Sequence, residues 1–381
     1  MTRDSTATAA TTVPFATTAT TAPFATVTTP GPLRAVVIGA GFMGRHWARE
    51  LAAHPDVTQV GWVDQDTDRI AEALREQQRE QQGEQQGEQQ GQQQDSVRTG
   101  TDLAAMLAAE QPDLVINSTT PAAHLAVTTA ALEHGCAVLT EKPMAMNLAE
   151  ARALVEVAER TGRLLAVNQD RRQLAGVAAL REAARRLAPL TRLEIDFRLP
   201  HQAGPYVHLW DEPLLREMAI HLFDAARSVT GADAVSAFGR TYRTPWSWYP
   251  GNCSADVLFE MEGDLAFAFT GCWTARSAFT SWSGSWYLEG AGGCARWDGV
   301  TAPVLTAARG ENEPEPPAVP LPVAIQDSPF PGLAEVLAGF VTALRTGAVP
   351  AGECHDNLRS LAMVEAAVAS ARAGRPLPVE R

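Results

Sequence analysis

The pattern of apolar and polar positions changes about halfway along the 381-residue chain. Between residues 33 and 167, short apolar runs alternate with segments in which apolar residues recur every three to four positions. The runs predict buried strands, and the segments between them predict helices. We expect strands at 33–38, 60–63, 114–116, 137–139 and 164–167. We expect helices at 44–54, 66–75, 103–109, 147–160 and from residue 121. This alternation predicts an α/β fold with a parallel, doubly wound sheet.

A different pattern begins near residue 190. Longer strands with partial alternation are predicted at 193–199, 235–242, 255–261, 265–273 and 286–288. One early helix is expected at 213–230, and two closing helices at 332–345 and 355–373. Strands and helices segregated in this way predict an α+β domain built on a mainly antiparallel sheet. We therefore expect a first domain at residues 33–165 and a second at residues 166–381.

Two segments have a low-complexity composition. Residues 1–32 are rich in Thr, Ala and Pro and hold too little apolar surface to offset their ordering entropy, so we expect a disordered tail. Residues 76–95 are rich in Gln and repeat Gly-Glu-Gln-Gln at 83–86 and 87–90. This composition predicts a surface insertion at the end of a helix.

Charge and cysteine content narrow the function classes. The formal net charge of −13, without a basic run, argues against nucleic acid or an anionic membrane as a partner. We find no run of 18 apolar residues and no apolar segment typical of a secretory signal. The five cysteines are odd in number and lack C-x-x-C spacing, so neither a disulfide framework nor a metal site is expected. Together these features favour the reducing cytoplasm.

A glycine motif joins the first predicted strand to the first predicted helix. Gly39, Gly41 and Gly44 form G-x-G-x-x-G, in which the first allows a tight turn, the second lets a pyrophosphate approach, and the third lets the helix pack closely. Asp64 lies 20 residues after Gly44, at the end of the second strand. A carboxylate there accepts ribose hydroxyls and repels a 2′-phosphate, so NAD is favoured over NADP. The alternative is an ordinary turn and a strand-end carboxylate.

Lys142 is the only lysine among 31 basic residues. It lies in Glu141-Lys142-Pro143, directly after the strand 137–139, and ligands bind at the carboxyl ends of parallel strands. Arginine is used everywhere else, although it is bulkier and always protonated, whereas lysine is a compact charge with a tunable pKa. The alternative is a surface lysine, but the composition favours a role that arginine cannot fill.

The helix expected at 213–230 carries a second candidate group. Glu217 and His221 are four residues apart and therefore lie on one face, with Asp224 three residues further on. An adjacent apolar stripe is formed by Leu214, Met218, Leu222 and Ala225. Histidine titrates near neutral pH and suits general base catalysis. The alternatives are a structural histidine and a solvated surface pair.

The motifs resemble those of the Gfo/Idh/MocA oxidoreductases, which include glucose–fructose oxidoreductase and inositol dehydrogenase. The resemblance covers about residues 33–379 and rests on Gly39–Gly44, Thr120-Pro121-Ala122-Ala123-His124 and Glu141-Lys142-Pro143 in this order. It implies an N-terminal Rossmann domain, a C-terminal domain with a large open sheet, and a lysine near nicotinamide and substrate. The family motif Asp-x-Gly-x-His-x-x-Asp has its counterpart at 217–224, with Glu217 in place of the first Asp and Ala219 in place of Gly.

The resemblance also implies roles for individual residues. Cofactor contacts are expected at Gly39, Gly41, Phe42, Met43, Gly44, Asp64, Thr120, Pro121, His124, Glu141, Lys142 and Gln169. Catalysis is expected of Lys142, Glu217 and His221, and substrate contacts of Lys142, Arg172, His221 and Trp248. Loop solvation is an equal alternative for Gln169 and Arg172. For the six tryptophans between 246 and 297, core or interface packing is favoured over substrate binding.

We therefore predict an NAD(H)-dependent oxidoreductase that interconverts a secondary alcohol and a ketone on a sugar, a sugar derivative or a cyclitol. Its partner is a small-molecule substrate, and an exposed sheet face favours a homodimer or homotetramer. One alternative is a dinucleotide-binding regulator without turnover, which the presence of both Lys142 and His221 argues against. Another is NAD-dependent glycoside cleavage through transient oxidation.

Overall fold

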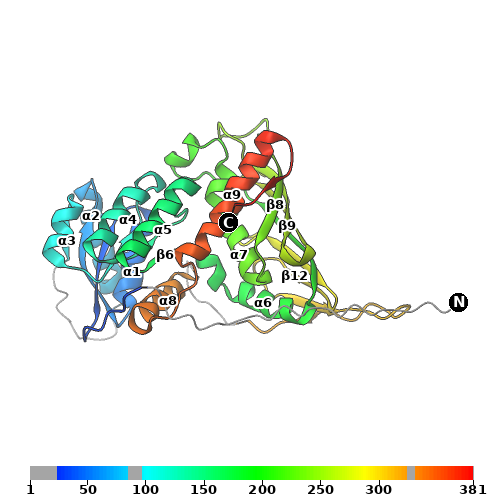
Figure 1. Ribbon diagram of the computed structural model, residues 1–381, viewed down its shortest axis with the longest axis horizontal. Coiled ribbons are helices and arrows are strands. Elements are labelled where there is room, and N and C mark those ends of the chain that lie inside the picture. Colours follow the sequence, from blue (N-terminus) through cyan, green and yellow to red (C-terminus); the bar gives the residue numbers. More distant parts are fainter. Residues whose placement is uncertain (1–23, 85–96, 324–330, 381) are drawn as a thin grey trace.

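The first domain contains a six-stranded parallel sheet. The computed structural model describes residues 24–84, 97–323 and 331–380. The strand order is β3-β2-β1-β4-β5-β6, and every neighbouring pair is parallel. The strands are β1 (Leu33–Ile38), β2 (Val57–Val63), β3 (Arg98–Gly100), β4 (Leu114–Asn117), β5 (Ala137–Thr140) and β6 (Leu165–Val167). The predicted doubly wound sheet is confirmed (Figure 1).

Helices cover both faces of this sheet. They are α1 (Phe42–Ala53), α2 (Thr67–Glu84), α3 (Leu103–Glu110), α4 (Pro121–His134) and α5 (Leu148–Thr161). Along β1, Val36 and Ile38 enter one apolar core, whereas Ala35 and Val37 enter the other, because successive side chains point to opposite faces. The capping box of α5 is confirmed, since the Asn147 side chain accepts from the Glu150 N–H at 3.0 Å.

The second domain is built on a nine-stranded sheet, in the order β14-β13-β12-β11-β7-β10-β9-β8-β15. Only β7 and β10 pair in parallel, so the predicted mainly antiparallel sheet is confirmed. The strands are β7 (Leu190–Arg198), β8 (Ala234–Tyr242), β9 (Ser254–Met261), β10 (Leu265–Cys272), β11 (Ser285–Gly290), β12 (Gly293–Trp297), β13 (Val304–Ala307), β14 (Val319–Pro320) and β15 (Leu377–Pro378). Phe223 packs edge-on against Phe259, Phe267 and Phe269 beneath this sheet.

The helices of the second domain differ from the prediction in two ways. A single early helix was expected, but α6 (Ala175–Leu187) precedes it and buries Val177, Leu180, Ala184 and Leu187. The sequence carries this helical period, so the signal was present. The expected helix 213–230 is a π-helical turn, η3 (Leu214–Ala219), continued by α7 (Ile220–Thr230). Single π-turns within helices are frequent at functional sites, and this one carries Glu217.

The closing helices connect the two domains. Helix α9 (Cys354–Ala373) runs across the molecule and packs on α5 and β6 as well as on α7 and β8 (Figure 1). Helix α8 (Leu333–Thr346) was assigned to the second domain, but it packs on α1 and its apolar face joins the core of the first domain. The position of α8 in the sequence therefore does not indicate the domain to which the helix belongs. In the parts of the chain that the structure describes, no helix has the length and apolarity needed to cross a bilayer.

Both low-complexity predictions need correction at their edges. In the expected tail, Val27 N–H donates to the Leu344 carbonyl at 2.8 Å and the Arg345 guanidinium donates to the Thr29 carbonyl at 2.7 Å. The segment from residue 24 therefore lies on α8, whereas residues 1–23 are outside the described residues. Helix α2 continues past the expected end at Arg75 to Glu84. The part of the Gln-rich insertion from residue 85 on is outside the described residues.

Candidate active site

The glycine loop after β1 leaves an open space beside its middle glycine. Gly39 has a φ of 97°, and a Cβ on it would lie 2.7 Å from the Ser118 carbonyl oxygen. A Cβ on Gly44 would lie 2.0 Å from the Gly39 carbonyl oxygen. Gly41 meets no such limit, because a Cβ there would have no atom within 4 Å. The chain's own packing does not require a glycine at this position, whereas close approach of a pyrophosphate does.

The surroundings of this loop suit the rest of a dinucleotide. Gly41 caps α1 without a side-chain hydrogen bond, and the first turn of the helix has no acidic residue, so its N–H groups can receive an anion. Asp64 accepts from Ala40 N–H at 2.6 Å, which holds its carboxylate beside the loop. Phe42, at the start of the helix, is 65% exposed, and the side chain of Met43 is half-buried. The residues present therefore fit NAD.

The Thr-Pro-Ala-Ala-His motif at the start of α4 packs against the turn that follows Lys142. Thr120 and Pro121 begin the helix, although the Thr120 side chain makes no capping hydrogen bond. His124 is buried, with Nδ1 2.8 Å from the Pro143 carbonyl oxygen and Nε2 3.1 Å from the Thr119 carbonyl oxygen. Burial lowers the pKa of this imidazole. Because both ring nitrogens face the backbone, the geometry favours a role in holding the turn after Lys142 over the predicted cofactor contact.

Glu141 is also turned into the protein. Its Oε1 atom accepts from Trp47 Nε1 at 2.8 Å and from Asn168 Nδ2 at 2.9 Å. These contacts link α1 and the end of β6 to the strand end that carries Lys142. Burial raises the pKa of Glu141 to about 7, although both hydrogen bonds and the charge of Lys142 oppose the increase.

Lys142 and Glu217 meet across the domain boundary. The Lys142 Nζ atom donates to Glu217 Oε1 at 2.7 Å and to the Glu217 carbonyl oxygen at 3.0 Å. Tyr206, on the short helix η2 (Pro205–Leu209), donates its hydroxyl to the same Oε1 at 3.0 Å. Burial and the Glu217 carboxylate raise the pKa of the Tyr206 hydroxyl. The glutamate that replaces the family's aspartate thus reaches the lysine.

His221 lies beside Asp170, which the sequence patterns did not single out. The two side chains approach to 3.3 Å between His221 Nδ1 and Asp170 Oδ1. Asp170 begins the short helix η1 (Asp170–Gln173) directly after β6, so its position at a strand end was an available signal. Burial lowers the pKa of His221, with Asp170 opposing and Lys142 and Arg171 adding to the decrease. Burial raises the pKa of the Asp170 carboxyl, but His221 and the nearby cations lower it more, so the pKa of Asp170 falls below its ordinary value.

Several buried polar atoms around these pairs have no hydrogen-bond partner in the described protein. They are Asn168 Oδ1, Gln169 Oε1 and Nε2, Arg171 Nε and Glu217 Oε2. Buried polar atoms are nearly always paired in folded proteins, so such a cluster indicates a place for a ligand. Gln169, which the sequence predicted as a cofactor contact, is 2% exposed. Its amide stays a candidate for that role.

Arg172 does not share this environment. Its guanidinium binds Asp224 through two nitrogens, with Nη2 2.7 Å from Oδ1, and its Nη1 lies 2.6 Å from Asp356 Oδ2. Ser360 also donates to Asp224 Oδ1 at 2.6 Å. These contacts join η1, α7 and α9. The geometry therefore favours a structural role for Arg172 and Asp224 over the predicted substrate contact of Arg172.

The tryptophans divide into two groups. Trp273, Trp286 and Trp297 are buried, so the interpretation as core packing is confirmed for these three. Trp248 is half-buried and donates its indole N–H to the His201 carbonyl at 3.2 Å, and its substrate contact stays a prediction. Trp282 is 45% exposed and lies edge-on to the His201 ring.

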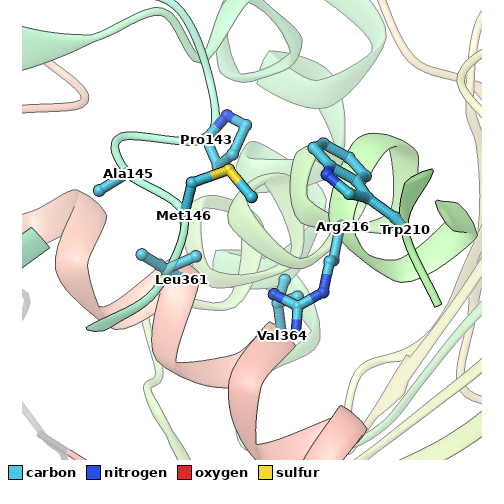
Figure 2. Close-up of a pocket in the computed structure, with 7 residues that line it drawn as sticks. All are labelled: Pro143, Ala145, Met146, Trp210, Arg216, Leu361 and Val364. Atoms are coloured by element: carbon cyan, nitrogen blue, oxygen red, sulfur yellow. The ribbon is translucent and has the colours of Figure 1, made fainter. Parts of the chain in front are cut away.

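A crevice lies behind the turn that follows Lys142. Figure 2 shows Pro143 and Met146 on one side and Trp210 and Arg216 on the other, with α9 closing the base. Its volume of about 10 Å³ leaves room for about one water molecule. Arg216 is paired with Glu365 of α9 at 2.6 Å. The crevice is therefore a seam between packed elements and too small for a substrate.

The start of α9 brings together three metal-ligand types that the sequence patterns did not indicate. One ligand atom each of Glu353, Cys354 and His355 lies within 4.8 Å of the others. Their atoms already bond to one another, and His355 Nε2 lies 3.0 Å from Glu159 Oε1. These hydrogen bonds account for the cluster as a helix-end arrangement.

The comparisons with known proteins agree with this site. Residues 33–169 match the model of an oxidoreductase family with an NAD-binding Rossmann fold, Gfo/Idh/MocA. A D-apiose dehydrogenase of Paraburkholderia graminis is 28% identical over 357 residues, covering 91% of this chain and 90% of the relative. An Agrobacterium radiobacter oxidoreductase in complex with NAD+, L-tartaric acid and magnesium has a TM-score of 0.75 at 21% identity, covering 91% of this chain and 98% of that one. The WlbA dehydrogenase of Chromobacterium violaceum in complex with NADH and UDP-GlcNAcA has a TM-score of 0.74 at 18% identity, covering 94% and 98%.

The two structures share the fold, and the family match adds the cofactor, which is NAD. The parallel sheet and the glycine loop with its open space agree with this match. Residues 33–169 match the NAD-binding domain of the Gfo/Idh/MocA oxidoreductase family, and the relatives named as dehydrogenases fit an NAD(P)-dependent dehydrogenase that acts on CH–OH groups.

Proposed function

We propose that this protein oxidises a secondary alcohol of a sugar, a sugar derivative or a cyclitol to a ketone, or catalyses the reverse reduction, with NAD. The observation that carries the proposal is that the Lys142–Glu217 pair and the Asp170–His221 pair occupy the same end of the parallel sheet. Both pairs lie where β5 and β6 end and where ligands bind in such folds. NAD supplies the hydride acceptor when bound.

His221 is the general base of the oxidation. Its Nδ1 faces Asp170 at 3.3 Å, which orients the ring and leaves Nε2 to take the hydroxyl proton. Because burial lowers the pKa of His221, the ring is neutral at physiological pH and ready to accept this proton. As in other His–carboxylate pairs, Asp170 stabilises the imidazolium that forms.

Lys142 positions the same oxygen. An ammonium group has three N–H donors, and two of them are used by Glu217, whose Oε1 and backbone carbonyl oxygen accept from Lys142. The third donor is left for the substrate oxygen, on which negative charge develops as the proton leaves. Glu217 therefore acts as a positioning residue for the lysine, and Tyr206 supports Glu217.

The relatives support a carbohydrate substrate. One relative is named D-apiose dehydrogenase after a sugar, and the WlbA dehydrogenase was crystallised with NADH and UDP-GlcNAcA. A regulator that only senses the dinucleotide has no need of both a base and a positioned lysine. These observations favour a dehydrogenase over the regulator.

The test is a substrate panel followed by two variants. Aldoses, ketoses, polyols, inositols and sugar acids are incubated with NAD or NADP, and NADH formation is followed by absorbance. His221→Ala should lower kcat at least a hundredfold with NADH affinity unchanged, because general base catalysis contributes at least this factor. His134→Ala, at an exposed histidine of α4, is the matched control. No NADH formation with any compound, or full activity of His221→Ala, would overturn the proposal.

A further inference from the structure

Arg171 differs from the neighbouring arginine in having no carboxylate partner. In the parts of the chain that the structure describes, the only hydrogen bond of its side chain is from Nη1 to Ser283 Oγ, at 3.3 Å. Its Nε is buried and unpartnered, and no carboxylate of the described residues forms a salt bridge with it. A partly buried guanidinium normally has a carboxylate or phosphate partner, as Arg172 has.

Arg171 lies close enough to the proposed base, His221, for its charge to lower the pKa of that ring. It follows Asp170, which touches His221, on the short helix η1 that packs against α7. The nearby carboxylates are already committed, Asp170 to His221 and Glu217 to Lys142. The charge of Arg171 attracts the Asp170 carboxylate, but no carboxylate of the described residues forms a salt bridge or hydrogen bond with the Arg171 guanidinium, whose Nε is left unpartnered.

Ser283, the hydrogen-bond partner of Arg171, follows an exposed tryptophan in the chain. Ser283 lies in the loop between β10 and β11, next to Trp282. The Trp282 ring is 45% exposed, and its centroid lies 4.7 Å from that of His201 and 6.4 Å from that of Phe197. An exposed indole of this kind packs well against the C–H groups of a sugar. Ser283 therefore binds the Arg171 guanidinium and is the chain neighbour of a partly exposed indole.

We propose that the substrate carries a carboxylate, which Arg171 binds together with Ser283 while the Trp282 ring covers the adjoining carbon atoms. A carboxylate is preferred over a phosphate because the subsite offers one guanidinium and one hydroxyl, matching a single negative charge. The planar fork of arginine also matches the two oxygens of a carboxylate. This inference rests on the proposed dehydrogenase function and narrows its substrates to sugar acids.

The test measures binding to the NADH-loaded enzyme and does not depend on turnover. D-Glucuronate, D-galacturonate and D-gluconate are titrated by calorimetry beside D-glucose, D-galactose and the methyl ester of D-glucuronate. At least one acid should bind tenfold or more tightly than its uncharged counterpart. Arg171→Gln should abolish this preference while NADH affinity and the thermal midpoint stay at wild-type values. Arg375→Gln removes one exposed positive charge at the far end of α9 and is the matched control.

The outcomes separate this inference from the proposed function. If every acid binds no better than its neutral counterpart, or if Arg171→Gln keeps the preference, the inference is wrong. Oxidation of neutral polyols by wild type and Arg171→Gln alike would leave the dehydrogenase and remove the acid subsite. Binding of acids through Arg171 without NADH formation from any compound would leave the subsite and remove the dehydrogenase. The ester comparison needs no variant, so it decides between these outcomes even if Arg171→Gln folds poorly.

Discussion

Glu141→Gln should make the stability of this protein less dependent on pH. In the folded protein burial raises the pKa of Glu141 to about 7, against an ordinary value of 4.5. Between these values the folded protein holds a proton that the unfolded chain has released, so the free energy of unfolding falls as the pH rises. Each tenfold difference in proton affinity corresponds to about 1.4 kcal/mol, which gives a loss of about 3 kcal/mol by pH 8. Below pH 4.5 the group is protonated in both states and contributes nothing.

The glutamine side chain retains the contacts without the charge. Trp47 Nε1 and Asn168 Nδ2 both donate to Oε1, and a glutamine carbonyl can accept both bonds. Glu141→Gln should therefore gain up to about 3 kcal/mol relative to wild type at pH 8 and nothing at pH 4.5. For a chain of this length the gain corresponds to a rise of about 4 °C in the thermal midpoint.

The assay is thermal unfolding of both proteins without cofactor at pH 5 and pH 8. The quantity compared is the difference between the two midpoints at each pH, so any constant effect of the amide cancels. Glu156→Gln, at an exposed position of α5, is the control and should show no pH-dependent difference. An equal midpoint difference for Glu141→Gln at both pH values would refute the expected proton uptake by Glu141.

Four further results are expected. Asp170→Asn should move the acidic limb of the kcat/KM profile for alcohol oxidation to lower pH, because Asp170 raises the pKa of His221; an unmoved limb would exclude this pairing. Bound NADH should slow the acylation of Lys142, and Lys142→Arg should fold but lose most of its activity. If NADH does not change the rate of labelling, Lys142 is an ordinary surface lysine. Gly41→Val should weaken NADH binding at least tenfold by fluorescence titration without changing the thermal midpoint, since the chain leaves that space empty. Arg172→Ala should cost about 3–5 kcal/mol because it strands a buried carboxylate, and a normal midpoint with weakened substrate binding would restore the predicted substrate contact.

The topology and the cofactor loop were predictable because they rest on local patterns. The alternation of short apolar runs with helical segments gave the first sheet, and G-x-G-x-x-G at a strand–helix junction gave the NAD site. Helix α8 was assigned to the wrong domain because an apolar stripe indicates that a helix packs on a core but does not indicate on which core. The end of α2 was misjudged because Gln is a good helix former, and a Gln-rich composition does not end a helix.

The active-site partners were harder to predict because they depend on contacts between distant segments. Lys142 and Glu217 were identified as separate residues, but their bond joins positions 75 apart in the chain. Asp170 and Tyr206 carry no spacing signal towards their partners, since each meets its partner only when separate segments of the second domain fold together. Arg172 and Arg171 are neighbours in the sequence, and only the fold shows that the first has two carboxylates and the second, among the described residues, none.

The Lys142–Glu217 pair, which we propose to be catalytic, joins the two domains beside a group of ion pairs within the second domain. Lys142 comes from the end of β5, and its partner Glu217 comes from the π-turn before α7. A small rotation between the domains would separate them, because a hydrogen bond weakens steeply when its distance or angle departs from ideal. The arginine contacts to Asp224, Asp356 and Glu365 tie η1, the π-turn, α7 and α9 together beside this junction. Buried ion pairs add little net stability but are strict about geometry, so we infer that these arginines hold the angle at which the lysine meets its glutamate.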